Sequence, residues 1–213
     1  MSQQISLREA ERKVFRTAYD DGLWDVFLGS FLLSFAVAPL LSPILGDFWS
    51  SAVFLPLWVL VFLAIRLVRK HVVARRVGVV RFGQARKARL RRFTLVMLLL
   101  NAAALILGFI VAPNFARIPG QMIAFAVGAM LLIGFSIAAY FLDIGRFYVY
   151  GLLAGLAPLV GEWLWTHGYA ADHGFPVTFG ITAAIMILVG LAVFVRLLRD
   201  NPVPTEAIPP EEG

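Results

Sequence analysis

Six separate blocks of about twenty apolar residues constrain the fold of this chain more than any other feature of its sequence. An α-helix needs about 20 residues to cross the ~30 Å hydrocarbon core of a bilayer. Backbone groups in lipid must form their hydrogen bonds within the protein, so such blocks are expected to be helices. The sequence therefore predicts an all-α polytopic bundle with spans at Leu23–Leu45, Trp49–Val68, Phe93–Pro113, Gly120–Leu142, Arg146–Trp165 and Phe175–Leu198.

The composition excludes a soluble domain. Hydrophobic residues make up 60% of the chain and charged residues 15%, whereas soluble domains are typically about 45–50% apolar and about 25% charged. A soluble fold of this size needs a more polar surface than these residues can supply. The absence of cysteine also excludes disulfides and thiolate metal sites within the chain.

The basic residues are distributed unequally between the two sides of the predicted membrane domain. All 19 Lys and Arg residues except Arg117 lie before the first span, between the second and third, in the turn after the fourth, or at the end of the last. The positive-inside rule places this side in the cytoplasm. We therefore expect a protein of the bacterial inner (plasma) membrane with both termini in the cytoplasm.

Three regions are distinguished along the chain. In residues 1–22, apolar residues recur at helical spacing beside an arginine face, which predicts an amphipathic helix on the membrane surface. A solvated helix leading into the first span is the alternative. Residues 23–198 form the six-span membrane domain, which includes a basic cytoplasmic loop at 69–92. Residues 199–213 are rich in proline and are expected to be disordered.

Two short motifs lie at the cytoplasmic side of this domain. Asp21–Asp25 (DGLWD) opens the first span, and Arg76–Phe82 (RVGVVRF) lies in the basic loop. Both are similar to motifs of an uncharacterised family of multi-pass bacterial membrane proteins, which often carry such an entry and such a loop. The resemblance implies a multi-pass fold and brings with it no known activity.

Three polar side chains inside the spans are functional candidates, because polar groups in lipid are costly. Asp25 lies one turn into the first span. It either faces the interior and pairs with a loop arginine or, as we expect, stays at headgroup depth near the positive start of the helix. Asn101 is expected to bridge two helices rather than contact a substrate. Glu162 lies near the outer end of the fifth span, as either an outward-facing proton or cation site or an interfacial carboxylate.

The charged and histidine residues of two loops are predicted to have structural rather than chemical roles. Asp143 and Arg146 are three residues apart in the turn between the fourth and fifth spans, which predicts a local ion pair worth ~0–1 kcal/mol. His167, Asp172 and His173 share the last outer loop, but their spacing matches no established metal motif. We therefore predict no metal site and no cofactor.

Small residues recur at four-residue spacing in three of the spans. This pattern lets helices approach closely, and we expect it to serve packing within one bundle rather than dimerisation. The pairs are Gly151 with Gly155, Ala124 with Gly128, and Ala104 with Gly108.

The basic loop is the strongest chemical feature of the sequence. A basic residue near an anionic membrane surface contributes ~1 kcal/mol to binding. Aromatic residues are sparse in the loop, so stacking on nucleic-acid bases is not predicted. The residues predicted to bind lipid or a partner protein are Arg75, Arg76, Arg81, Arg86, Lys87, Arg89, Arg91 and Arg92.

No pattern of a catalytic nucleophile with its base, a phosphate-binding glycine loop or paired zinc ligands is present in the sequence. The sequence therefore predicts a non-enzymatic membrane protein whose basic face binds anionic lipid headgroups or a partner protein, with a homo-oligomer as a further possibility. Two alternatives remain open. One is a small ion- or solute-transporting protein that uses Glu162 and Asn101, and the other is a lipid-modifying membrane enzyme.

Overall fold

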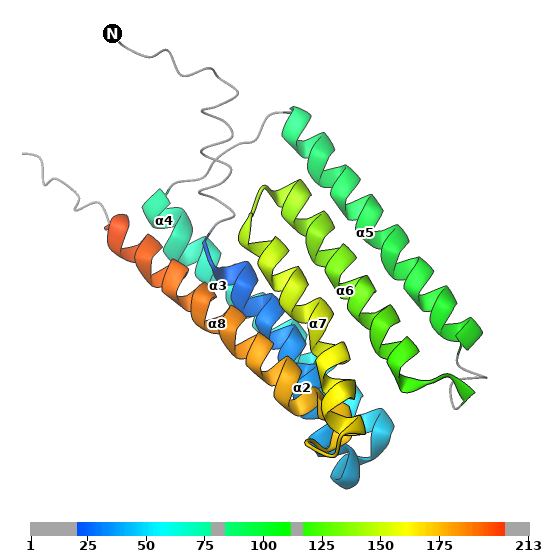
Figure 1. The fold of residues 1–213 in the computed structure, drawn as a ribbon. Coiled ribbons are helices and arrows are strands. Elements are labelled where there is room, and N and C mark those ends of the chain that lie inside the picture. The colour runs from blue at the N-terminus through cyan, green and yellow to red at the C-terminus, as the bar shows by residue number, and fades with distance from the viewer. Residues whose placement is uncertain (1–20, 78–83, 112–116, 203–213) are drawn as a thin grey trace, which may run out of the picture.

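The computed structural model describes residues 21–77, 84–111 and 117–202, drawn as coloured ribbon in Figure 1. These residues are almost entirely helical and include no strand. In chain order the elements are α2 (Leu23–Ala52), α3 (Phe54–Val68), η1 (Arg69–Val73), α4 (Ala74–Val77), α5 (Gln84–Val111), α6 (Gly120–Leu142), α7 (Arg146–Thr166), η3 (Asp172–Gly174) and α8 (Phe175–Asp200).

Six helices of the described chain are long and apolar enough to cross a membrane, which confirms the predicted all-α six-span bundle. The tight turn predicted between the fourth and fifth spans is also present. Asp143 adopts a left-handed backbone (φ 58°) at the end of α6, and α7 begins at Arg146. The predicted surface helix over residues 1–22 and tail over 199–213 lie almost wholly outside the described residues.

The break after the first span is made by a glycine. Gly46 has φ 78° and ψ 161°, a conformation that residues with a side chain rarely adopt, and it interrupts α2 beside the predicted end at Leu45. The second span continues without interruption through α3, the π-helical turn η1 and α4, so the helix extends past the predicted end at Val68 into the basic loop. The third span also begins earlier than predicted, because α5 starts at Gln84 within the basic loop rather than at Phe93.

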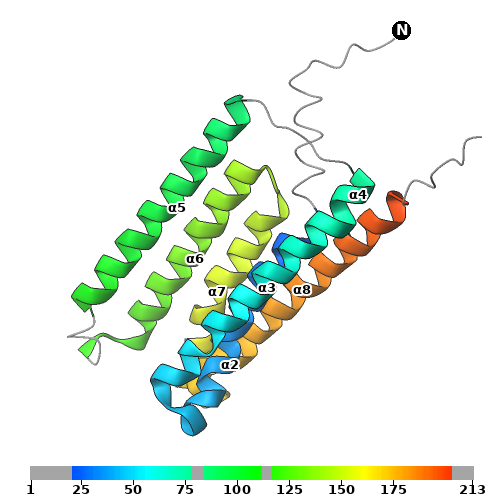
Figure 2. The same ribbon diagram turned by 180° about the vertical axis from the view of Figure 1, so that it is seen from behind.

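The helices are arranged in a row rather than a closed ring. Figures 1 and 2 show α5 at one edge, followed by α6, α7 and the closely packed pair of α2 and α8. α3 and α4 lie behind this pair in Figure 1 and in front of it in Figure 2. The most extensive contacts join α2 to α8 and α6 to α7, and α7 links the two pairs through α8. α5 packs mainly on α6. The first and last spans are therefore neighbours, and α5 is the most peripheral helix.

Fully buried side chains from α2, α7 and α8 form the centre of the bundle. Leu32, Phe147, Phe179 and Met186 have almost no exposed surface and belong to one hydrophobic cluster. Most large apolar residues that remain exposed lie along the spans, as expected for helices that face lipid. The cluster holds the two helix pairs together.

The small residues serve packing at two of the three predicted places. A Cβ atom on Gly128 would lie 2.3 Å from the Gly155 carbonyl oxygen, and one on Gly151 would lie 2.9 Å from the Phe135 Cβ. These glycines therefore allow α6 and α7 to approach closely, as predicted. The prediction is wrong for Gly108, because a Cβ atom there would meet nothing within 4 Å. Gly108 lies on an open part of α5.

Candidate functional site

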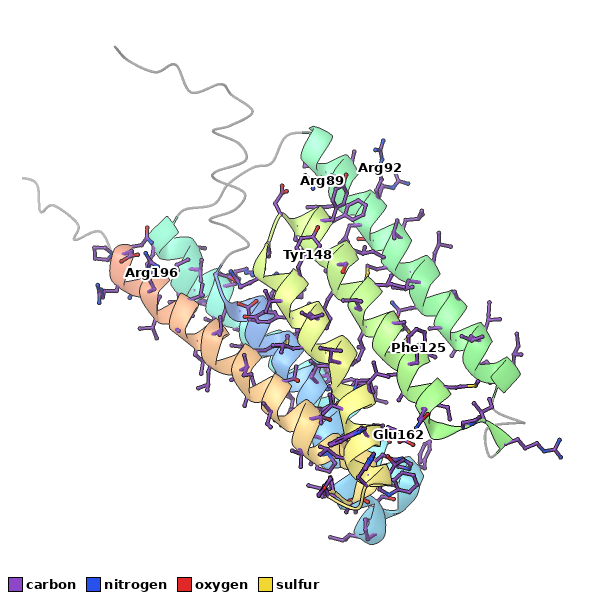
Figure 3. All side chains as sticks on the ribbon, viewed as in Figure 1. Arg89, Arg92, Phe125, Tyr148, Glu162 and Arg196 are labelled. Atoms are coloured by element: carbon purple, nitrogen blue, oxygen red, sulfur yellow. The ribbon has the colours of Figure 1, made fainter. Side chains whose placement is uncertain are left out.

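The charged residues of the described chain gather at one end of the bundle, which we call the basic end. Here α4, α6 and α8 end and α2, α5 and α7 begin. Figure 3 shows Arg89, Arg92 and Arg196 at this end and Glu162 near the other. Among the described Lys and Arg residues, Arg117 alone lies at the opposite end, beside the start of α6. The two ends therefore offer different chemistry and are considered separately.

Asp25 is fully buried at the basic end, with 0% of its surface exposed. Its Oδ2 atom accepts a hydrogen bond from Nε of Arg146 at 2.7 Å, which joins α2 to the first residue of α7. Its Oδ1 atom has no hydrogen-bond partner among the described residues. Of the two positions predicted for Asp25, the structure shows the interior one paired with an arginine, although the partner Arg146 belongs to α7 and not to the basic loop. The side chain faces the interior, because this side of α2 packs against α8.

Asp21 is the second buried acid of the motif that opens α2. Its Oδ2 atom accepts hydrogen bonds from Arg69 at 2.9 Å (Nε) and 2.6 Å (Nη2), and its Oδ1 atom accepts one from the Leu23 backbone N–H at 3.1 Å. Arg69 also lies over the Trp24 ring at 5.6 Å. Burial raises the pKa of Asp21, and the Arg69 guanidinium opposes that rise.

Gly22 lies between these two acids in the sequence and allows α2 to pack closely against α8. It has a left-handed backbone with φ 76°. A Cβ atom at this position would lie 2.1 Å from the Gly190 carbonyl oxygen, so only glycine fits between α2 and α8. The Asp21–Asp25 motif is thus a structural unit that ties α2 to η1, to α7 and to α8.

The predicted ion pair between Asp143 and Arg146 is replaced by pairs with other helices. Asp143 Oδ2 lies 3.1 Å from Nη1 of Arg89 on α5, and Arg89 also donates to the Tyr140 carbonyl. Arg146 pairs instead with Asp25. The physical reason is the left-handed turn at Asp143, which ends α6 next to α5 while α7 starts beside α2. The ion pairs therefore connect helices rather than fix the turn.

The residues predicted to bind lipid divide into two groups. Arg76 donates to the Leu198 and Asn201 carbonyls at 2.9 and 3.2 Å, where it satisfies oxygens at the end of α8, and Arg89 is held by Asp143. Lys87, Arg91 and Arg92 are exposed on α5. The side chains of Arg75 and Arg86, and the whole of Arg81, lie outside the described residues.

Glu162 is buried at the opposite end of α7, with 4% of its surface exposed. Its Oε2 atom lies 2.7 Å from Nδ1 of His173 in η3. Its Oε1 atom faces the start of α6, where a Cβ atom on Gly120 would lie only 2.1 Å away. The positive end of a helix favours a carboxylate in this position. Glu162 is therefore an internal residue that joins α7 to the last loop and lies against the start of α6.

An unusual backbone brings His173 to this position. Asp172, His173 and Gly174 all have positive φ values of 50°, 53° and 64°. Such a conformation is costly for residues with a side chain, so the surrounding contacts must hold it. One of these contacts is the Trp165 ring, whose centroid lies 4.2 Å from that of His173.

An open cavity of about 380 Å³ lies beside the Glu162–His173 pair. Its polar lining comes from the serines Ser42, Ser50 and Ser51 and from Asp172 and His173. Rings of Phe35 and Phe175 complete the walls. The described residues contain no group of three or more His, Asp or Glu side chains placed to hold a metal ion. The cavity therefore offers hydroxyl, imidazole, carboxylate and aromatic contacts to a solute.

The third polar candidate, Asn101, does not bridge two helices of one chain among the described residues. Its side chain is exposed, and its Nδ2 atom donates to the Met97 carbonyl of the same helix at 2.7 Å. Within one chain the prediction is wrong. The sequence shows that the span contains an amide, but it does not show which side of the helix carries it. Asn101 thus lies on the open side of α5.

The three polar candidates do not meet in one site within the described residues. Asp25 lies beside Arg146 at the start of α7, whereas Glu162 follows Arg146 by sixteen residues, or ~24 Å of helix. Asn101 belongs to the peripheral helix α5. The comparisons with protein families, curated proteins and solved structures give no match for this chain.

Proposed function

We propose that this protein is a non-enzymatic protein of the bacterial plasma membrane whose basic end binds anionic lipid headgroups in the cytoplasmic leaflet. One observation carries the proposal. The described acids at the basic end are each paired with an arginine, and a surplus of exposed cations stays beside them. The pairs are Asp21 with Arg69, Asp25 with Arg146, Asp143 with Arg89 and Asp200 with Arg196.

The surplus cations lie on four elements, so they spread over the whole basic end. Each contributes about 1 kcal/mol near an anionic surface, and their combined effect is large compared with thermal energy. The internal ion pairs meanwhile hold the helix ends in place. The exposed basic residues are Arg66 and Lys70 on α3 and η1, Lys87, Arg91 and Arg92 on α5, and Arg199 on α8.

Neutralising three of these residues tests the proposal. The triple variant Lys87→Gln, Arg91→Gln, Arg92→Gln is expected to bind phosphatidylglycerol at least tenfold more weakly, because it loses up to about 3 kcal/mol of surface attraction. Native mass spectrometry of the protein released from mixed phosphatidylglycerol and phosphatidylcholine nanodiscs measures the lipid that is retained.

Two controls separate charge from packing. The charge-preserving triple variant Lys87→Arg, Arg91→Lys, Arg92→Lys is expected to retain the lipid, and so is Arg117→Gln at the opposite end. Equal lipid retention by the neutral and charge-preserving triple variants contradicts the proposal.

A second candidate function is the binding or transport of a small solute or ion at the Glu162 end. It is favoured by one observation, the contact of the buried Glu162 carboxylate with the exposed His173 beside an open cavity. Asn101 takes no part in this site, because it lies on α5 and bonds to its own helix. The lipid-modifying enzyme is less well supported, since Asp25, Asn101 and Glu162 lie far apart in the described structure.

Flux measurements in proteoliposomes test this second candidate. Glu162→Gln keeps the shape of the side chain but removes its charge, so we expect it to abolish any proton- or cation-coupled flux. The matched control is Asp200→Asn, which removes an exposed carboxylate at the basic end. If Glu162→Gln and the unmodified protein transport a broad panel of ions and solutes equally, Glu162 has no transport role.

A further inference from the structure

The peripheral helix α5 has an open face along most of its length. It forms one edge of the molecule in both views and packs mainly on α6. The contact with α6 uses residues such as Phe93, whose ring lies 5.7 Å from Phe141, and Leu100, which faces Gly134. No residue in the most apolar stretch of α5 is buried. This face is therefore covered by lipid or by another protein.

Asn101 lies on this open face at the middle of the membrane. It follows Arg92, the last basic residue of α5, by nine residues, or ~14 Å of helix, which is about half the ~30 Å hydrocarbon core. Within the described part of the chain, one of its amide N–H groups is used, in the bond to the Met97 carbonyl. A second N–H and a carbonyl oxygen remain, and hydrocarbon offers them no partner.

We propose that α5 is the interface of a symmetric homodimer in which the Asn101 amides of two copies bond to each other. Copies inserted in the same orientation are related by a two-fold axis along the membrane normal, so each residue near the axis meets its own counterpart at the same depth. An amide is both donor and acceptor and is therefore complementary to itself. This argument selects a second copy over a partner of different sequence.

The surface around Asn101 is shaped for close approach. Thr94 and Gly108 lie seven residues before and after it, on the same side of the helix, with Ala104 between. A Cβ atom on Gly108 would meet nothing within 4 Å, so this position is open to a neighbour. Small residues allow helices in membranes to come close enough for interhelical hydrogen bonds. Lys87 continues the row at headgroup depth.

The absence of cysteine provides a direct test, because any introduced cysteine is the only one in the chain. Oxidation of native membranes that contain Gly108→Cys or Thr94→Cys is expected to yield a disulfide-linked product of twice the mass of the chain. The matched control is Leu99→Cys, which is exposed at nearly the same depth as Asn101 but on the opposite side of α5. We expect little cross-linking of this control.

Asn101 itself is tested in the Gly108→Cys background. Asn101→Leu is expected to weaken dimerisation roughly three- to twentyfold, the range seen for single interhelical hydrogen bonds in membranes. Asn101→Gln keeps the amide and is expected to retain most of the cross-linking. Efficient cross-linking of Leu99→Cys, an unchanged yield with Asn101→Leu, or a cross-linked product that contains another protein would each overturn the proposal. Thiol labelling of membranes before oxidation, followed by purification of the variant, confirms that each variant is present and that its cysteine is accessible.

Discussion

Replacing Arg146 by methionine is expected to destabilise the protein by roughly 3–5 kcal/mol, because the buried Asp25 carboxylate then loses the cation that pairs with it. This loss of stability is measured as a lower SDS concentration at the midpoint of unfolding, in a titration of the detergent-solubilised protein with SDS. The same loss is expected for Asp25→Ala, which leaves the guanidinium of Arg146 without its acceptor.

The double variant Asp25→Leu, Arg146→Met provides the control for this pair. Replacing both partners of a buried ion pair by apolar residues is often neutral, so the double variant is expected to recover most of the lost stability. Arg92→Met, which removes an exposed arginine, should change stability by less than about 1 kcal/mol. No recovery in the double variant means that the pair is not what stabilises this end of the bundle.

The second large effect is expected at Gly22. An alanine there must adopt a left-handed backbone, at a cost of about 1–2 kcal/mol, and its Cβ atom would also overlap the Gly190 carbonyl oxygen at 2.1 Å. Because backbone atoms of α8 cannot move aside easily, we expect Gly22→Ala to lower stability by roughly 3 kcal/mol or more. The same SDS titration measures this loss.

Gly168→Ala separates the two contributions at Gly22. Gly168 has a similar backbone, with φ 74°, but a Cβ atom there would meet nothing within 4 Å. This variant should show the cost of the backbone alone. Equal losses for the two variants are the result that argues against a close contact between α2 and α8 at Gly22.

The spans could be predicted from the sequence because one physical length, the thickness of the hydrocarbon core, governs them all. The same principle located the turn at Asp143, since one helix through α6 and α7 is too long for a bilayer. The partners of the charged residues were not predictable in this way. Asp25 and Arg146 are 121 positions apart, and nothing local to either residue specifies the other.

The rotation of each helix about its axis was the other unknown. Gly128 and Gly108 occupy equivalent sequence patterns, yet one faces α7 and the other faces open space. Glu162 and His173 were each noted in the sequence, but the run of positive φ values at Asp172–Gly174 that joins them has no clear sequence signal beyond its final glycine.

The pairing of Asp25 with Arg146 also sets an order of events during synthesis. The ribosome adds the 121 residues from Val26 to Arg146 at about 5–20 residues per second, so α2 waits roughly 6–24 s for its partner cation. During that time the acid has no arginine from α7 beside it. α8, against which α2 packs most extensively, emerges later still. The first spanning helix of the described chain, α2, therefore reaches its final environment only when α8 has been made.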